Sequence, residues 1–238
     1  MFSTGKGMVK KILFRSSFLN GLSRPKYEFC LSPAQLSWLC RAISETRSAN
    51  RQPGCIVEVG VARGMTTTFL LKHMEIEEDS RRYYCLDTFG GFTAEDVDYE
   101  VTVRDKRRRD YGGFAYNDLS AFKKNLIKNG FKNGIAIKAD VGRFDFSVLA
   151  PIDVMLVDVD LYRPTLCALR DSYPFLNSRA FVMVDDVVAG SIYDGAGEAY
   201  HEFIKSENLP CIMLGKNAGL IINGSDPAAE TNSVLAHS

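Results

Sequence analysis

The sequence predicts an α/β fold, in which strands alternate with helices and form a parallel sheet that the helices cover. Strand-like and helix-like segments alternate from about residue 55 onward. Two of the strand-like segments, 153–158 and 180–185, are apolar runs of the kind that is buried on both faces. The interval between their final residues, Asp158 and Asp185, suits a strand, a crossover helix and a neighbouring strand of one β-α-β unit.

Residues 1–54 are predicted to form an N-terminal helical cap segment. Ser32 and Pro33 suit the N-cap and the first residue of a helix, and apolar residues recur after them at helical spacing. The polar residues 47–54 then separate this helix from the first strand.

Residues 55–222 are predicted to form the main domain, because strand-like and helix-like patterns alternate through this range. The expected strands are 55–59, 82–86, 135–139, 153–158, 180–185, 211–214 and 218–222. The expected helices are 66–74, 118–128, 164–175 and 198–205. The remaining residues, 223–238, are small and polar and are predicted to be a disordered tail.

The segment 90–113 is longer than ordinary loops of about 12 to 15 residues. Because it follows a strand, it lies at the carboxyl edge of the predicted sheet, and we expect it to act as a lid. Its basic run, 106–109, is flanked by Asp105 and Asp110, which favours a solvated face over a binding patch.

The overall composition fits one α/β domain. The 238 residues are 46% hydrophobic, enough for a substantial core, and their formal net charge is zero. A neutral chain has no large electric field to attract nucleic acid or an anionic membrane, so we expect neither partner. No apolar stretch reaches the length of a membrane span.

The cysteines favour a reducing compartment. All six are scattered and none forms a C-x-x-C pair, so free thiols are expected in place of a disulfide framework or a zinc site. The run 8–15 begins like a signal sequence, but polar residues interrupt its apolar part from Arg15 onward. A cytoplasmic location is therefore expected.

Acidic residues follow both apolar strands and predict a metal site. Asp158 ends the first strand, and Asp185 and Asp186 end the second, so their carboxylates should meet at the carboxyl edge of the sheet. Two carboxylates about 4 Å apart repel each other by roughly 4 kcal/mol at an effective dielectric constant of about 20. A magnesium ion would offset this repulsion, and it binds carboxylate oxygens while leaving room for substrate.

Each of these acids has a second interpretation. One or two of the three could cap helices, as acidic residues after strands often do. Asp158 is also a candidate catalytic base, because it would lie beside the hydroxyl of a substrate bound to the ion. Asp160 precedes a predicted helix, so capping is at least as good an interpretation of it as substrate contact.

A glycine turn follows the first strand and suits an adenosine-bearing ligand. The turn is Glu58-Val-Gly-Val-Ala-Arg-Gly64, whose glycines allow close backbone approach and an uncrowded helix start. It is neither G-x-G-x-x-G nor a phosphate loop, and a plain strand-to-helix turn is the alternative. Asp87 ends the next strand, where it can accept hydrogen bonds from both ribose hydroxyls, which favours S-adenosylmethionine.

Other residues near these strand ends complete the predicted binding site. Phe89 could pack on the adenosine or anchor the lid, and Asp140 could bind the adenine amino group or stabilise a turn. The residues expected to bind S-adenosylmethionine are Glu58, Gly60, Val61, Gly64, Thr66, Asp87, Thr88, Phe89 and Asp140.

Four successive motifs resemble those of the macrocin O-methyltransferase family: the glycine turn, Asp87-Thr-Phe-Gly-Gly-Phe92, Asp158-Val-Asp-Leu-Tyr-Arg-Pro-Thr165 and Val184-Asp-Asp186. The resemblance covers roughly residues 55–222. It implies a Rossmann-like class I methyltransferase fold, with a seven-stranded, mostly parallel sheet whose last strand is antiparallel and helices on both faces. It also implies methylation of a sugar hydroxyl of a natural product, with S-adenosylmethionine and Mg²⁺.

Two alternatives to this activity stay open. One is an enzyme of the same fold with other chemistry, such as an aminopropyl transferase, which would need no magnesium cluster. The other is a non-catalytic methyltransferase-like partner of another protein, against which the intact acidic and glycine motifs argue. The acceptor is a small molecule with hydroxyl groups, of a kind that the sequence leaves open. Related enzymes commonly form homo-oligomers.

Overall fold

The structure is a computed structural model that describes residues 8, 9, 12, 27–49 and 52–224. The chain divides into two compact units, residues 1–30 and residues 31–238, and the second unit holds the sheet. Most of the signal-like run 8–15, and the predicted disordered tail from residue 225 onward, lie outside the described residues.

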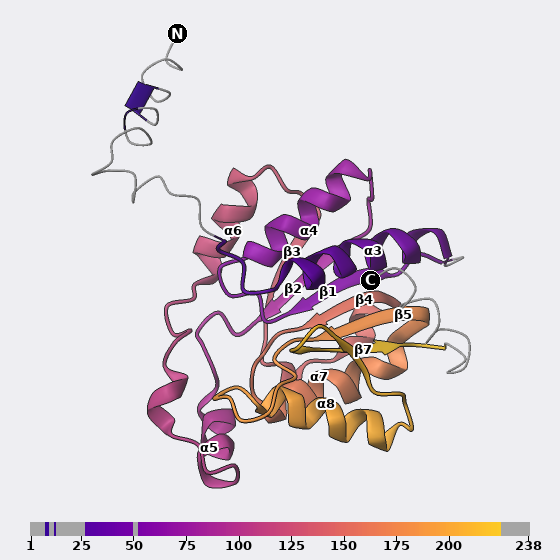
Figure 1. The fold of residues 1–238 in the computed structure, drawn as a ribbon. Coiled ribbons are helices and arrows are strands. Elements are labelled where there is room, and N and C mark those ends of the chain that lie inside the picture. Colours follow the sequence, from indigo (N-terminus) through magenta and orange to yellow (C-terminus); the bar gives the residue numbers. More distant parts are fainter. Residues whose placement is uncertain (1–7, 10–11, 13–26, 50–51, 225–238) are drawn as a thin grey trace. The chain divides into compact units, whose positions relative to one another are not determined.

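A seven-stranded sheet in the order β3-β2-β1-β4-β5-β7-β6 forms the centre of the second unit (Figure 1). Its strands are β1 Cys55–Val59, β2 Tyr83–Asp87, β3 Gly134–Lys138, β4 Ile152–Val157, β5 Leu176–Val184, β6 Ile212–Leu214 and β7 Ala218–Ile222. The strands from β3 to β5 pair in parallel, whereas β7 is antiparallel to both β5 and β6. The predicted fold class and its antiparallel last strand are confirmed.

Helices cover both faces of this sheet, as Figure 1 shows with α3 and α4 on one face and α7 and α8 on the other. The α-helices are α3 Pro33–Ala49, α4 Met65–Ile76, α5 Ala94–Thr102, α6 Leu119–Lys128, α7 Tyr162–Ser172 and α8 Gly195–Ser206. Short 3₁₀ turns are η1 Arg108–Tyr111, η2 Val141–Arg143, η3 Phe146–Leu149 and η4 Tyr173–Phe175. Because the strand order reverses between β1 and β4, their carboxyl ends border the crevice in which such sheets bind ligands.

The core lies on both sides of the two central strands. Every residue of β1 and β4 is buried, which explains why their sequences lack the alternation of a half-exposed strand. Helix α3 packs against α4, β4 and β5, and Trp38 makes an edge contact with Phe181 of β5. In the described part of the chain, no helix has the length and apolar composition needed to cross a membrane.

The segment 90–113, predicted to be a long loop, contains helix α5 and the turn η1. Thr93 is the N-cap of α5: its hydroxyl oxygen accepts a hydrogen bond from the amide of Asp96, and the hydroxyl donates to the Asp96 carboxylate. The Thr93 hydroxyl thus caps the helix and bonds to the Asp96 side chain, and the T-x-x-D spacing of this pair indicates a helix start in the sequence. The length of the segment therefore reflects a helix and not an irregular loop.

Candidate functional site

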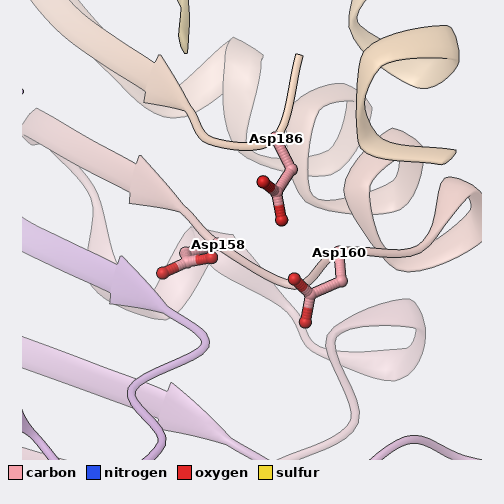
Figure 2. Close-up of side chains that lie close together, drawn as sticks. All are labelled: Asp158, Asp160 and Asp186. Carbon is pink, nitrogen blue, oxygen red and sulfur yellow. The ribbon is translucent and has the colours of Figure 1, made fainter. Parts of the chain in front are cut away.

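Three carboxylates meet at the carboxyl ends of β4 and β5. One oxygen each from Asp158, Asp160 and Asp186 lies within 4.8 Å of the oxygens from the other two. Figure 2 shows all three side chains directed toward one common space. Asp160 and Asp186 adopt the left-handed backbone region, with φ of 64° and 57°, which non-glycine residues rarely do. This backbone conformation directs both side chains into the common space beyond the strand ends.

Two of the three acids, Asp158 and Asp160, lie where burial and neighbouring acids disfavour their charged forms. Burial raises the pKa of Asp158, and the charges of Asp185 and Asp160 raise it further. Burial and contact with Asp186 likewise raise the pKa of Asp160. In the part of the chain that the structure describes, no lysine, arginine or histidine forms an ion pair with these acids. A set of carboxylate oxygens without a cation fits a hard divalent ion such as Mg²⁺.

The membership of this group differs in one residue from the set expected from the sequence. Asp158 and Asp186 were expected, but Asp160 is in the group, whereas Asp185 is not. The Asp160 side chain does not cap α7, because the N-cap is Leu161 and the Tyr162 amide donates to Glu100 Oε1. The D-x-D spacing of Asp158 and Asp160 was the available signal, since one residue between them allows both to line the strand exit.

Asp185 lies beside the group and is held by neutral donors. Its Oδ1 accepts hydrogen bonds from Gln35 Nε2 at 2.6 Å and from Asn217 Nδ2 at 3.3 Å. Burial raises the pKa of Asp185 to about 6, while the hydrogen bond from Gln35 acts to lower it. No sequence signal identified Gln35 or Asn217, because both are distant in the chain from Asp185.

The glycine turn after β1 has no side chain where another part of the backbone approaches. A Cβ atom added to Gly60, with φ of +86°, would lie 1.8 Å from the carbonyl oxygen of Asp158. A Cβ added to Gly64, with φ of +81°, would lie 2.7 Å from the ring of Phe122. Gly60 therefore lets the turn lie directly against the strand end that carries Asp158, and Gly64 lets α4 begin beside α6.

Asp87 connects this turn to the end of β2. Its Oδ2 accepts hydrogen bonds from the amides of Val61 and Ala62 at 2.9 and 3.1 Å, and its Oδ1 accepts one from the Phe89 amide at 2.6 Å. A carboxylate has about four lone-pair positions, so three backbone donors leave about one for a ligand. Asp87 thus shapes the turn in addition to any contact with ribose.

The residues after Asp87 lie close to the turn. The Thr88 hydroxyl donates a hydrogen bond to the Gly91 carbonyl oxygen, so it stabilises the start of the 90–113 segment. Phe89 is buried, and its ring centroid lies 5.2 Å from that of Phe122.

Glu58 is placed inside the domain. It is 1% exposed, and its Oε2 accepts hydrogen bonds from the hydroxyls of Tyr83 at 2.6 Å and Thr67 at 2.7 Å. Burial raises the pKa of Glu58 to about 7, against the effect of these two hydrogen bonds. Its neighbour in the predicted site, Thr66, is also buried in the first turn of α4.

Asp140 has a turn role in the structure, which was one of its two predicted interpretations. Its Oδ1 accepts a hydrogen bond from the Gly142 amide at 3.0 Å and caps η2. Its Oδ2 lies 3.6 Å from Arg143.

An aromatic cluster, which we define as Phe92, Tyr111, Phe114 and Tyr193, borders the acidic group. Ring centroids within it are 5.4 to 6.3 Å apart. Tyr193 packs against the buried group that includes Tyr111 and Leu161, and Leu161 directly follows Asp160 in the chain. Burial raises the pKa of Tyr193, and the charges of Asp160 and Asp186 raise it further. Sequence reasoning did not identify the cluster, because it joins the 90–113 segment to the residues before α8.

Comparison with known sequences identifies related proteins. The sequence model of the family described as macrocin-O-methyltransferase (TylF) matches residues 20–214. A relative from Streptomyces olivaceus, 8-demethyl-8-(2,3-dimethoxy-alpha-L-rhamnosyl)-tetracenomycin-C 4'-O-methyltransferase, is 29% identical over 164 residues. The match covers 67% of this chain, and the chain spans 61% of the length of that relative.

Solved structures with the same fold include two methyltransferases. The O-methyltransferase NovP has 17% identity and a TM-score of 0.69, with 84% of each chain covered. The calicheamicin methyltransferase CalS11 has 19% identity and a TM-score of 0.63, with 92% of this chain and 91% of that chain covered. At these identities the likeness concerns the fold.

Proposed function

This chain belongs to the macrocin-O-methyltransferase (TylF) family, and from that membership we propose that it methylates a sugar hydroxyl of a glycosylated small molecule. The observation that carries the proposal is the group of three carboxylates beside the glycine turn of β1. The relative from Streptomyces olivaceus is named for 4'-O-methylation of a rhamnosyl tetracenomycin, which favours a sugar as the acceptor.

The methyl donor in this proposal is S-adenosylmethionine. The turn at Gly60 and Gly64 and the end of β2 at Asp87 would hold it, together with Val61 and Phe89. The close approach at Gly60 supports this placement, because it leaves no side chain between the turn and the acidic strand end. When bound, S-adenosylmethionine supplies a methyl group on a positively charged sulfur, which becomes a neutral thioether after transfer.

Other residues of the predicted donor site have supporting roles. Glu58 and Thr66 are buried behind the turn, Thr88 bonds to the backbone, and Asp140 caps η2. We propose that these four residues shape the donor site. Asp140 remains a candidate for an adenine contact through its half-buried carboxylate.

A divalent ion, for which we propose Mg²⁺, would be held by Asp158, Asp160 and Asp186, with Asp185 as an adjacent acid. When bound, it would lower the pKa of a coordinated acceptor hydroxyl and fix the position of that oxygen. The all-carboxylate donor set and the absence of an ion-pair partner in the described chain support this proposal.

We assign the acceptor proton to Asp158. Asp158 directly follows β4, and its backbone contacts the glycine turn at Gly60. It therefore lies between the proposed donor site at the turn and the proposed ion site. The aromatic cluster beside the acids offers ring faces on which a sugar or an aromatic aglycone can pack and from which water is excluded.

A methyl-transfer assay tests the proposed activity. The full chain would be incubated with S-adenosylmethionine labelled in its methyl group, and with a rhamnosyl polyketide or its aglycone as the acceptor. We expect label only on the glycoside.

Asp158→Asn should lower the rate by about 100-fold or more, because a general base contributes that much. The matched control Asp145→Asn changes an exposed acid that caps η3, and it should keep the wild-type rate. Equal rates for both variants would contradict the role of Asp158.

A chelation experiment tests the ion separately. Excess chelator should abolish methyl transfer and leave S-adenosylmethionine binding intact, because the acids contact the acceptor side of the site. Calorimetry with the donor and rate measurement with the glycoside would be made on the same samples. Full turnover in excess chelator would eliminate the divalent ion, and the transferase proposal would then rest on the base alone.

A further inference from the structure

Gln35 connects helix α3 to the acidic edge of the sheet. Its Nε2 donates a hydrogen bond to Asp185 Oδ1 at 2.6 Å across 150 residues of sequence. Gln35 is 1% exposed and Asp185 is 6% exposed, so the bond is buried. A hydrogen bond to a charged acceptor is stronger than one between neutral groups, and the low dielectric of a buried site strengthens it further.

The same glutamine also caps α3. The Gln35 Oε1 accepts a hydrogen bond from the Ser32 amide at 2.8 Å, and the Ser32 hydroxyl accepts one from the Gln35 amide at 3.3 Å. This capping box uses only the side-chain oxygen of Gln35. The side-chain nitrogen is free of the cap, and the two bonds together fix the orientation of its amide plane toward Asp185.

A second neutral donor, from a residue that follows Asp185 in the chain, bonds to the same carboxylate oxygen. Asn217, in the turn between β6 and β7, donates to Asp185 Oδ1 at 3.3 Å. Its backbone carbonyl oxygen accepts a hydrogen bond from the Val187 amide at 2.8 Å, which fixes Asn217 beside the residues that follow Asp186. Asp185 is therefore held between an N-terminal helix and a C-terminal turn.

We propose that Gln35, assisted by Asn217, is a positioning residue for the ion site: it orients Asp185 and offsets the repulsion of this carboxylate from Asp158 and Asp186. This inference rests on the proposed ion-dependent function. Two neutral donors lower the electrostatic cost of placing a fourth carboxylate beside three others without neutralising the site. A cationic residue in the place of Gln35 would compete with the ion.

The test measures binding of Mn²⁺ alone to the full chain, without donor or acceptor. Gln35→Met keeps the length of the side chain and removes its donor. We expect the Mn²⁺ affinity to fall about 10-fold, the lower end of the loss seen when a hydrogen-bond partner of a metal ligand is removed, because Asp185 is adjacent to the ligands and is not one of them. Ser32→Ala is the matched control: it weakens the same helix cap but keeps the Ser32 amide for Gln35, and it should bind Mn²⁺ like the wild type.

A double-mutant cycle with Asp185→Ala separates positioning from general damage. If Gln35 acts through Asp185, Gln35→Met should cause no further loss in the Asp185→Ala background. The chain has one tryptophan, Trp38 of α3, and its emission shows whether the helix stays on β5 in each variant. If Gln35→Met does not fold, Asn217→Ala tests the same carboxylate without changing α3 and should weaken Mn²⁺ binding to a smaller extent.

The outcomes distinguish this inference from the proposed function. Wild-type protein that binds Mn²⁺, with Gln35→Met and Asn217→Ala binding it equally well, would overturn the positioning role and leave the ion site intact. An equal loss for Gln35→Met with and without Asp185 would also overturn it. Wild-type protein that binds no divalent ion would overturn the ion-dependent function, and the inference with it.

Discussion

Glu58 is a buried acid whose partners are two hydroxyl groups. Its pKa is about 7 because burial penalises the charged form, whereas the ordinary value is 4.5. The folded protein therefore holds this proton more tightly than the unfolded chain does. The resulting stabilisation is complete below pH 4.5 and is lost as the pH rises through 7.

Glu58→Gln should remove this pH dependence while keeping an acceptor for Tyr83 and Thr67. Relative to the wild type, the variant should gain about 2 to 3 kcal/mol in unfolding free energy between pH 5 and pH 8. Urea denaturation of both proteins at the two pH values measures the difference. The control, Glu75→Gln, changes an exposed acid paired with Lys72 and should show no such gain. A Glu58→Gln profile parallel to the wild type would mean that Glu58 titrates normally.

Gly60 brings the glycine turn, the proposed donor site, into backbone contact with the strand end that carries Asp158. Gly60→Ala would place Cβ 1.8 Å from the Asp158 carbonyl oxygen, at a φ of +86° that alanine adopts at a cost of about 1 to 2 kcal/mol. The strand end that carries Asp158 must then move. We expect weaker binding of both S-adenosylmethionine and Mn²⁺, measured by calorimetry. Gly130→Ala, also at positive φ but with open space around it, controls for backbone strain. Equal binding by the two alanine variants would exclude the contact as a cause.

Helix α5 is attached to α7 and α8 by a buried charge network around Arg104. The Arg104 side chain is 9% exposed and pairs with Glu100 at 2.8 Å, Asp194 at 3.1 Å and Glu198 at 2.6 Å. Glu100 also accepts a hydrogen bond from the Tyr162 amide at 2.8 Å. These contacts hold the segment 90–113 against the helices that follow the acidic strands, and they define what a lid movement would have to break.

Arg104→Met should leave Glu100 buried without its cation and lower the unfolding free energy by about 3 to 5 kcal/mol. Limited proteolysis at 106–109 should accelerate in this variant. The control Arg108→Ala removes an exposed pair with Asp98 and should change stability by about 0.5 kcal/mol or less.

In the wild type, donor and acceptor together should slow proteolytic cleavage at 106–109 if the segment 90–113 acts as a lid. Equal cleavage with and without ligands would show that it is fixed.

At the scale of the whole sheet unit, α3 is anchored at both edges of the sheet. Gln35 contacts Asp185 at the carboxyl edge. Near the other end of the helix, Arg81 donates to the Thr46 hydroxyl at 2.9 Å and to the Ile43 carbonyl oxygen, and it pairs with Asp153 at 2.9 Å. Eleven helical residues rise about 16 Å, close to the length of a five-residue strand, so one helix spans the sheet.

Arg81→Met should release the second anchor of α3. Because it leaves Asp79 buried without its cation, the unfolding free energy should fall by about 3 to 5 kcal/mol. Denaturation followed by Trp38 emission measures this change and reports on α3 directly. Arg41→Ala, which removes an exposed pair with Glu45 on the same helix, should have little effect. Comparable losses in both variants would mean that the buried network is not the anchor.

The sequence by itself determined the architecture of this protein. Each strand of the sheet was predictable because apolar runs and their spacing are local properties, and the acidic ends of β4 and β5 follow from their place in the chain. The glycine turn was predictable for the same reason, since Gly60 and Gly64 do adopt positive φ. Helix α5 was missed, although its N-cap pair, Thr93 and Asp96, is also local.

Only the tertiary structure decided which acids meet and what holds them. Asp160 joins Asp158 and Asp186 because the backbone turns through a left-handed conformation at two of these residues, which no periodicity encodes. Asp185 is held by Gln35 and Asn217, which are far from it in the chain and meet it only in the folded protein. The direction of a side chain at a strand end depends on such long-range partners, so the sequence predicts where the acids gather and the fold decides their arrangement.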